Sequence, residues 1–421
     1  MNHELLKSII YDQHELIKNA EIVPREYDFD PNGNYVLVGL RRAGKSTLLY
    51  KRAQELIAGG CSWDQIIYVN FEDERLSEFS KYDLNDILSV QSELSEDKGY
   101  FFFDEIQIVD GWEKFCRRMA DAGESVCITG SNADMLSSEI ATTLGGRFLI
   151  KYITPYNFRE YLTALGVPHD SRAILQTRSN GRIRACCNEF LEYGGFPETL
   201  RYKAKREYIS SVYQKVLLGD IVTRNSIRND FAVKILIKKI AESVCSEISY
   251  TKLHGILKAI GLSVGKESII EYINYAKKAY LIFSFQNYYA RFAEKESTPR
   301  YYFSDNGLIN LFLNDKRSAL LENQVAVALM RAYPDGVYYL KSARTGIDID
   351  FYVPEARHII QAAWSIEGNA FERETGSIMK FAESSDTGHT YTIVTYEEER
   401  VIESGGIVIN VVPLMKFLIN I

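Results

Sequence analysis

The sequence predicts an α/β protein: a doubly wound parallel sheet, then a mostly helical middle domain, then a smaller α/β domain. Short apolar runs alternate with helical patterns over residues 1–165, as strands and helices do in parallel sheets. Helical patterns dominate residues 166–310, and strand-like runs return between residues 338 and 411. We therefore expect three domains, covering residues 1–165, 166–310 and 311–421.

The composition is that of a globular protein, with 46% hydrophobic and 25% charged residues among 421. A formal charge of -7 excludes a basic nucleic-acid coat protein. The charge is uneven, however. Residues 166–300 hold 22 Lys and Arg against 13 Asp and Glu, a net charge of +9, which leaves -16 for the rest. This asymmetry favours a basic middle domain with the charge to contact the phosphates of duplex DNA.

Several classes of protein are not indicated. The six cysteines form no C-x-x-C pair and the six histidines are scattered, so we expect neither a disulfide framework nor a zinc site. No apolar run reaches about 18 residues, the length of a membrane span. The N-terminus lacks a basic region followed by an apolar core, so we expect no signal peptide and a cytoplasmic protein.

The first core strand, residues 35–38, follows an N-terminal helical pattern at 4–18 and leads into a phosphate-loop motif. The motif fits G-x-x-x-x-G-K-[ST], the Walker A pattern, and a helical pattern at 47–57 follows it. Its glycines let backbone N–H groups turn toward phosphate oxygens at the positive end of that helix. Lys45 can reach the β- and γ-phosphates, and the Ser46 hydroxyl can ligate Mg²⁺. The predicted ATP-binding residues are Gly39, Leu40, Arg41, Arg42, Ala43, Gly44, Lys45, Ser46 and Thr47.

A strand at 65–71 and a helical pattern at 84–94 lead to Tyr-Phe-Phe-Phe-Asp-Glu at residues 100–105. Four consecutive aromatic residues predict a strand covered on both faces, as central parallel strands are. The two acids at its end match a Walker B box. Asp104 would hold Mg²⁺ beside the phosphate loop, and Glu105 would orient the attacking water.

Two further candidates come from the next elements. The strand at 126–132 ends in Ser131 and Asn132, either of which could sense the γ-phosphate or simply form a turn. Arg147 precedes a strand at 148–153. It could stabilise phosphoryl-transfer charge within the chain or in a neighbouring subunit, or be a surface residue. Action in a neighbouring subunit would require a homo-oligomer.

One strand lies between the Walker A and Walker B strands, and Glu105 follows the Walker B Asp, as in the additional-strand, catalytic-glutamate P-loop NTPases that include AAA+ proteins. The motifs at residues 38–47, 103–107 with 112–113, 129–132, 144–147 and 155–161 together resemble one family. It is the prokaryotic AAA-family ATP-binding proteins with a C-terminal domain of unknown function. The resemblance covers nearly the whole chain and implies ATP binding and hydrolysis to ADP and phosphate, without a known substrate.

The middle region predicts a winged helix, in which three helices precede a β-hairpin. Its helix at 265–279 would be the recognition helix. Contact with DNA, packing against a protein, and action as a lid over the nucleotide all remain open for such a domain. The helical patterns lie at 208–218, 231–243, 249–261 and 265–279, and the strands at 281–285 and 300–304. The last helix carries Lys266, Lys277 and Lys278. The charged loop between the strands holds Arg291, Glu294, Lys295 and Glu296.

The last region, with a helix at 320–332 and strands at 338–341, 348–353 and 359–364, resembles a restriction-endonuclease-like module. The resemblance puts Glu322, Asp350 and Gln361 on the metal-ligand positions of that fold. Its lysine position is Ala363, so an inactive nuclease fold used for packing or binding is the favoured interpretation. A nuclease gated by ATP is the alternative.

The sequence thus predicts a Mg²⁺-dependent ATPase of the AAA+ type that couples hydrolysis to domain movement, with duplex DNA as a candidate partner. The principal alternative is a slow nucleotide switch that acts through protein partners.

Overall fold

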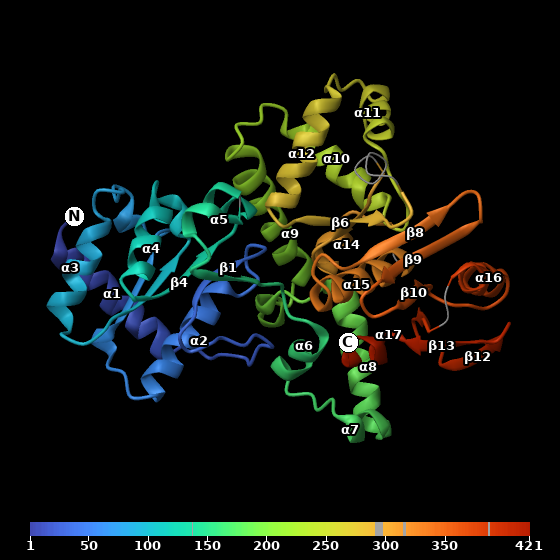
Figure 1. Cartoon of the computed structure of the whole chain (residues 1–421), viewed down its shortest axis with the longest axis horizontal. Helices are drawn as coiled ribbons and strands as arrows, with labels where there is room; N and C mark the ends of the chain where they lie inside the picture. The colour runs from blue at the N-terminus through green and yellow to red at the C-terminus, as the bar shows by residue number, and fades with distance from the viewer. Residues whose placement is uncertain (137, 291–297, 315–316, 386–387) are drawn as a thin grey trace. The chain divides into compact units, whose positions relative to one another are not determined.

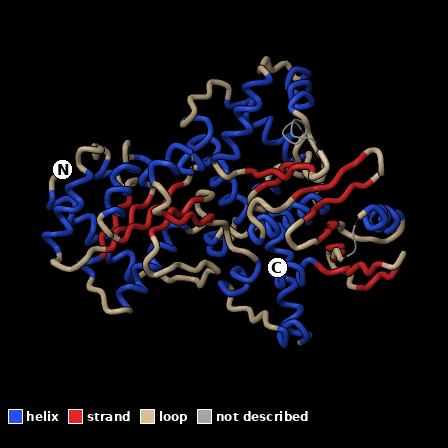
Figure 2. Tube along the Cα trace, in the orientation of Figure 1, coloured by secondary structure: helices blue, strands red, loops and turns tan. Residues whose placement is uncertain are grey.

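The computed structural model describes residues 1–421 except 137, 291–297, 315–316 and 386–387, and Figures 1 and 2 trace its helices and strands. It divides into two compact units. The first holds Met1–Thr154 with Lys278–Tyr280, and the second holds Pro155–Lys277 with Leu281–Ile421. The structure therefore has two units where the sequence predicted three domains. The first boundary falls 11 residues earlier than expected, and none separates 166–310 from 311–421.

The first unit is built on a five-stranded sheet in the order β2-β3-β4-β1-β5, with every neighbouring pair parallel. This confirms the predicted α/β class with a parallel sheet. Within the sheet, the strand between β1 and β3 is β4, whereas β2 lies at the edge. Central strands lie buried on both faces, which explains their unbroken apolar runs. The strands are β1 (Asn34–Val38), β2 (Ile66–Asn70), β3 (Tyr100–Asp104), β4 (Ser125–Gly130) and β5 (Phe148–Tyr152).

Helices surround this sheet, as Figure 1 shows. Helix α1 begins where the Asn2 side chain accepts a hydrogen bond from the Glu4 N–H. It packs on β2, and its buried residues include Ile9, Ile10 and Ile17. Among the described residues, no helix is both long enough and apolar enough to cross a membrane. The helices are α1 (His3–Lys18), α2 (Lys45–Ala58), α3 (Leu84–Leu94), α4 (Trp112–Asp121) and α5 (Ser138–Leu144).

His14 makes the contact between α1 and β2 sensitive to pH. Its Nε2 lies 2.7 Å from the Ile66 carbonyl oxygen, and burial lowers the pKa of the imidazole. The unfolded chain takes up a proton below about pH 6.5, while the folded imidazole resists protonation, so unfolding is favoured as the pH falls through that value. We expect denaturant unfolding to show that lowering the pH from about 7.5 to about 5.5 reduces the free energy of unfolding more in the wild type than in His14→Gln. The control His254→Gln should respond to pH as the wild type does. Equal pH responses in all three proteins would contradict this prediction.

Helices α6 to α12 precede the strands of the second unit in the sequence, and α14 to α17 lie between or after those strands. Helices α10, α11 and α12 are followed by the hairpin strands β6 and β7, the order predicted for a winged helix. The charged-loop residues Arg291, Glu294, Lys295 and Glu296 lie outside the described residues. The helices are α6 (Phe158–Ala164), α7 (Ser171–Leu175), α8 (Thr177–Tyr193), α9 (Lys205–Lys215), a π-helix at Val216–Thr223, α10 (Asp230–Glu242), α11 (Tyr250–Ala259), α12 (Lys266–Lys278), α14 (Asn306–Asn310), α15 (Arg317–Ala332), α16 (Asn369–Ser384) and α17 (Leu414–Asn420).

The second sheet has the order β12-β13-β11-β10-β9-β8-β6-β7. The predicted hairpin is not separate from it, because β6 pairs in parallel with β8 at Gln286↔Tyr338 and Asn287↔Tyr339. This pairing joins the two regions that the sequence assigned to different domains. The strands are β6 (Ile282–Asn287), β7 (Arg300–Phe303), β8 (Tyr338–Ser342), β9 (Ile347–Val353), β10 (His358–Ala362), β11 (Thr390–Thr395), β12 (Arg400–Ser404) and β13 (Ile407–Pro413).

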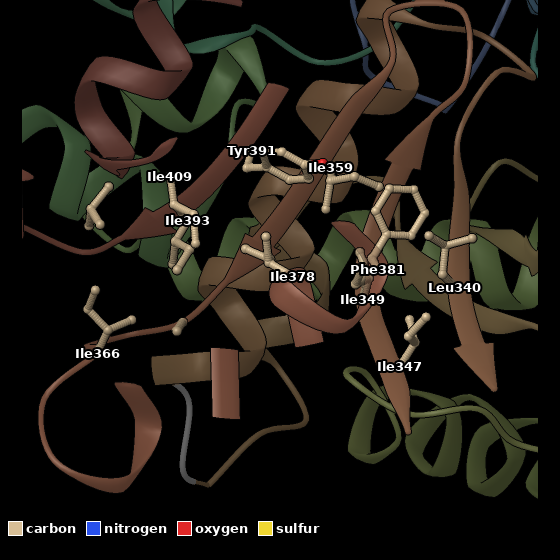
Figure 3. Packing of buried hydrophobic residues seen from close by; sticks show 12 residues of the cluster. Leu340, Ile347, Ile349, Ile359, Ile366, Ile378, Phe381, Tyr391, Ile393 and Ile409 are labelled. Carbon is tan, nitrogen blue, oxygen red and sulfur yellow. The ribbon is translucent and has the colours of Figure 1, made fainter. Parts of the chain in front are cut away.

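A hydrophobic cluster holds α16 against this sheet (Figure 3). Ile378 and Phe381 of the helix meet strand residues that include Ile349 and Ile359. Ala363, the predicted lysine position of a nuclease, belongs to this cluster and is 4% exposed. Because this position lies in the core, a lysine there would lose the hydration of its charge.

Candidate nucleotide-binding site

The phosphate loop connects β1 to α2. Gly39 has a φ of 145°, and a Cβ at this residue would lie 2.0 Å from the Ile153 carbonyl oxygen, so only glycine fits between the loop and the chain beyond β5. Gly44, with a φ of 98°, caps the N-terminus of α2. The helix therefore begins at Lys45, and its first N–H groups face the loop.

Basic side chains hold the loop from inside and from its flank. The Lys45 ammonium donates to the Gly39 and Leu40 carbonyl oxygens at 3.0 and 3.2 Å. Arg25 donates to the Ala43 and Thr154 carbonyl oxygens at 3.0 and 2.7 Å. These contacts keep the loop curled around the space that a phosphate chain would enter.

Asp104, at the end of β3, lies in a network of hydroxyl groups. It accepts hydrogen bonds from Tyr68 at 2.9 Å and from Thr129, and the Ser46 hydroxyl also hydrogen-bonds to it. Burial and the neighbouring charge of Glu105 raise the pKa of the Asp104 carboxyl, against the effect of these hydrogen bonds. A cation beside this carboxylate would offset that cost.

Glu105 has a left-handed backbone, with φ of 54° and ψ of 40°, which turns its side chain off the line of the strand. Its backbone N–H donates to the Thr129 hydroxyl at 3.0 Å. Its carboxylate accepts hydrogen bonds from Ser131 at 3.0 Å and from Gln107. Burial opposes ionisation, but the charge of Lys45 and the hydrogen bonds outweigh it and hold the pKa of Glu105 below its usual range. Glu105 is therefore a carboxylate at neutral pH.

The donor set fits Mg²⁺. Ser46 and Asp104 offer a hydroxyl and a carboxylate oxygen in hydrogen-bond contact with each other, and oxygen is the ligand that this hard cation prefers. Within the described ranges, no group of three or more His, Cys, Asp or Glu residues could hold a metal ion. Mg²⁺ here would thus depend on nucleotide phosphates for further ligands.

The remaining predicted residues divide into two groups. Ser131 contacts Glu105, and Asn132 follows it as a buried residue at the same end of β4. Arg147 lies at the other end of the sheet, because Phe148 pairs with Asn34 while the phosphate loop follows Val38. It is paired with Asp121 and donates to the Gly145 carbonyl oxygen at 3.0 Å. This placement does not support action on the chain's own nucleotide. The other two interpretations, a role in a neighbouring subunit and a surface residue paired with Asp121, both stay predictions.

Thr129 is the residue that the sequence analysis missed. Its hydroxyl bridges the two acids: it donates to Asp104 and accepts from the Glu105 N–H. A hydroxyl residue at the end of a buried apolar strand was a visible signal, but its two partners come from another strand.

We expect Thr129→Val to keep the side-chain shape and lower ATP turnover by about 10- to 100-fold, the value of one charge-assisted hydrogen bond. Phosphate release under saturating ATP measures it. Thr251→Val, which removes an exposed hydroxyl from α11, is the matched control. Turnover equal to that of the control would show that the bridge does not position the acids.

The structure also brings together Glu322, Asp350 and Gln361 in the second unit. Gln361 Oε1 accepts from the Asp350 backbone N–H at 2.7 Å, and burial and the charge of Asp350 raise the pKa of Glu322 to about 8. The two acids share a charged neighbour, Arg300 of β7, whose guanidinium donates to Asp350 at 3.0 Å and whose charge opposes the rise in the pKa of Glu322.

The parallel sheet, the phosphate loop and the acid pair define a P-loop ATPase domain of the AAA+ type. Residues 32–162 match a family model described as an AAA domain, and residues 186–319 match a domain of unknown function, DUF8612. The uncharacterized protein MJ1544 of Methanocaldococcus jannaschii is 30% identical over 98% of this chain and 95% of its own length. An uncharacterized protein of Haemophilus influenzae is 30% identical over 80% of this chain and 84% of its own. The chain belongs to the same family as these proteins.

Solved structures resemble the chain more weakly. The Walker-type ATPase PABY2304 of Pyrococcus abyssi has a TM-score of 0.43 and 16% identity, over 73% of this chain and 95% of that one. The Orc1 protein of Aeropyrum pernix, solved in complex with DNA, has a TM-score of 0.27 and 15% identity, over 77% of this chain and 93% of that one. These scores are too low for any function to be carried over.

Proposed function

We propose that the protein hydrolyses ATP to ADP and phosphate in this site. The observation that supports it best is the buried bridge Asp104–Thr129–Glu105, which sets an ionised carboxylate beside the phosphate-loop lysine. A carboxylate in that place can accept a proton from water and orient it toward a γ-phosphate. Lys45 would leave the loop carbonyls and neutralise phosphate charge as the nucleotide enters.

Mg²⁺, when bound, would offset negative charge on the phosphates as they are transferred. Ser46 and Asp104 would hold it. Ser131 would position the Glu105 carboxylate, to which it donates at 3.0 Å. Asn132, the next residue, would contact the γ-phosphate. The loop backbone from Gly39 to Thr47 would surround the phosphates.

Hydrolysis is tested by steady-state phosphate release from Mg²⁺-ATP by the full chain. We expect turnover in the wild type and in Lys98→Ala, an exposed lysine, and none above background in Lys45→Ala. Equal release by all three proteins would remove the site from the proposal. Turnover far below about 1 s⁻¹ that nothing stimulates would instead favour the slow switch.

The second part of the proposal is that duplex DNA binds the protein and is coupled to ATP hydrolysis. The net charge of +9 over residues 166–300 supports it. The exposed residues of the predicted recognition helix α12 carry both charges, since Lys266 is followed by Glu267 and Glu271. The sign of the charge on this helix alone therefore does not decide whether it contacts DNA. Duplex DNA of mixed sequence, added to the same assay, decides the point. Stimulation that weakens as salt is raised would support movement coupled to DNA, and unchanged turnover would direct the search to a protein partner.

A further inference from the structure

The cluster around Arg300 in the second unit lies outside the ATPase and is independent of it. Arg300 belongs to the hairpin strand β7, and its side chain is 3% exposed. Its guanidinium donates to Asp350 Oδ1 at 3.0 Å and to Asp348 Oδ1 at 2.5 Å, and it lies 4.7 Å from the centre of the Tyr339 ring. A buried cation thus contacts Asp350, one of the two acids that the nuclease resemblance placed at metal-ligand positions, together with its neighbour Asp348.

The other oxygens that a metal would need are also engaged. Asp350 Oδ2 accepts from the Ala362 N–H at 3.0 Å, and Glu322 Oε1 accepts from the Tyr302 hydroxyl at 3.0 Å. The carboxylate of Glu322 also hydrogen-bonds to Cys245. A divalent cation at this position would have to break several of these bonds and displace the guanidinium.

The side chain of Gln361 replaces hydrogen bonds between two backbone strands. The β9–β10 ladder ends at the pair Ile360↔Phe351, where β10 continues alongside β11. Beyond that point Gln361 bonds β9 with its amide: Oε1 accepts from the Asp350 N–H at 2.7 Å and Nε2 donates to the Asp348 carbonyl oxygen at 3.1 Å. The amide replaces the missing ladder bonds, which leaves it unsuited as a metal ligand.

The geometry points to Arg300 as a fixed cation that takes the place of a divalent metal among Glu322, Asp350 and Asp348, so this nuclease-like site binds no metal in the native protein. The residues do not fit the metal that the nuclease resemblance implies. Because Arg300 comes from the hairpin, the same contacts fasten β6 and β7 to the sheet at β9. These acids then stabilise the fold of the second unit, and without a bound metal ion they cannot catalyse metal-dependent phosphodiester cleavage.

The test counts Mn²⁺ bound to the full-length protein without nucleotide, by paramagnetic resonance of the free ion. Wild type and Asp350→Asn are expected to bind equal amounts. Arg300→Ala removes the guanidinium that lies between Asp348 and Asp350 and is expected to gain an additional site that Arg300→Ala/Asp350→Asn lacks. Arg344→Ala, an exposed arginine between β8 and β9, should match the wild type.

Thermal unfolding supplies an independent measurement. In EDTA, Arg300→Ala should unfold about 10 °C below the wild type, because the largely buried Asp350 carboxylate loses the guanidinium that it bonds, and Mn²⁺ should raise the midpoint again. If Arg300→Ala does not fold, Arg300→Lys keeps a cation in place and should fold without an additional Mn²⁺ site. More Mn²⁺ on the wild type than on Asp350→Asn, or a folded Arg300→Ala without the new site, would overturn the inference.

Discussion

Replacing Glu105 with Gln is expected to lower ATP turnover by about 10²- to 10⁴-fold, the usual contribution of a general base. Gln keeps the size of the side chain and can still accept hydrogen bonds from Ser131 and Gln107. What it loses is the negative charge and the ability to accept a proton from water. Because the pKa of Glu105 is held below its usual range, the loss should be the same at about pH 6 and pH 8.

ATP binding separates this explanation from a structural one. We expect Glu105→Gln to bind a fluorescent ATP analogue within about twofold of the wild type, since Lys45 and the phosphate loop remain. Glu96→Gln, an exposed acid beyond α3, should change neither turnover nor binding. Turnover within tenfold of the wild type would assign the proton to another group, and lost binding would make Glu105 a structural residue.

The sequence predicts this part of the protein well because its signals are local. The apolar strands, the glycine loop and the acids at the end of β3 are each complete within about ten residues, and parallel topology brings the carboxyl ends of the strands together. The role of Thr129 was not predicted, because it depends on two acids about 25 residues away along the chain. The placement of Arg147 escaped because only the register with β1 reveals it.

The second unit is harder to predict for the same reason. Arg300 and its acids are separated by 48 and 50 residues, and no pattern in the sequence links them. The hairpin was predicted correctly as two strands, but a strand pattern does not specify its neighbour in the sheet, and pairing with β8 removed the expected domain boundary. The helical pattern predicted at 208–218 stops before Gly219, yet the chain continues through this glycine as a π-helix, since a glycine weakens a helix without forbidding it.

The motif at residues 155–161 shows how a family signature can be structural. Asn157 and Glu160 form a capping box at the start of α6, with hydrogen bonds of 2.8 and 3.0 Å between each side chain and the other's N–H. Glu160 is 2% exposed, and Arg331 of α15 donates to both of its carboxylate oxygens at 2.9 and 2.8 Å. The pair joins helices that are 171 residues apart in the sequence.

Arg331→Met is therefore expected to destabilise the second unit by about 3–5 kcal/mol, because it removes both charged hydrogen bonds that Arg331 donates to the buried Glu160 carboxylate. Denaturant unfolding followed by Trp364 fluorescence, with Trp63 and Trp112 replaced by Phe, reports on this unit alone. The double variant Arg331→Met/Glu160→Gln should recover part of the loss, since the side chain that Arg331 faced is then neutral. ATP turnover of the folded single variant should stay near the wild-type value. Equal destabilisation of single and double variants would place the stabilisation in packing, and a loss of turnover would give the motif a role in the ATPase reaction.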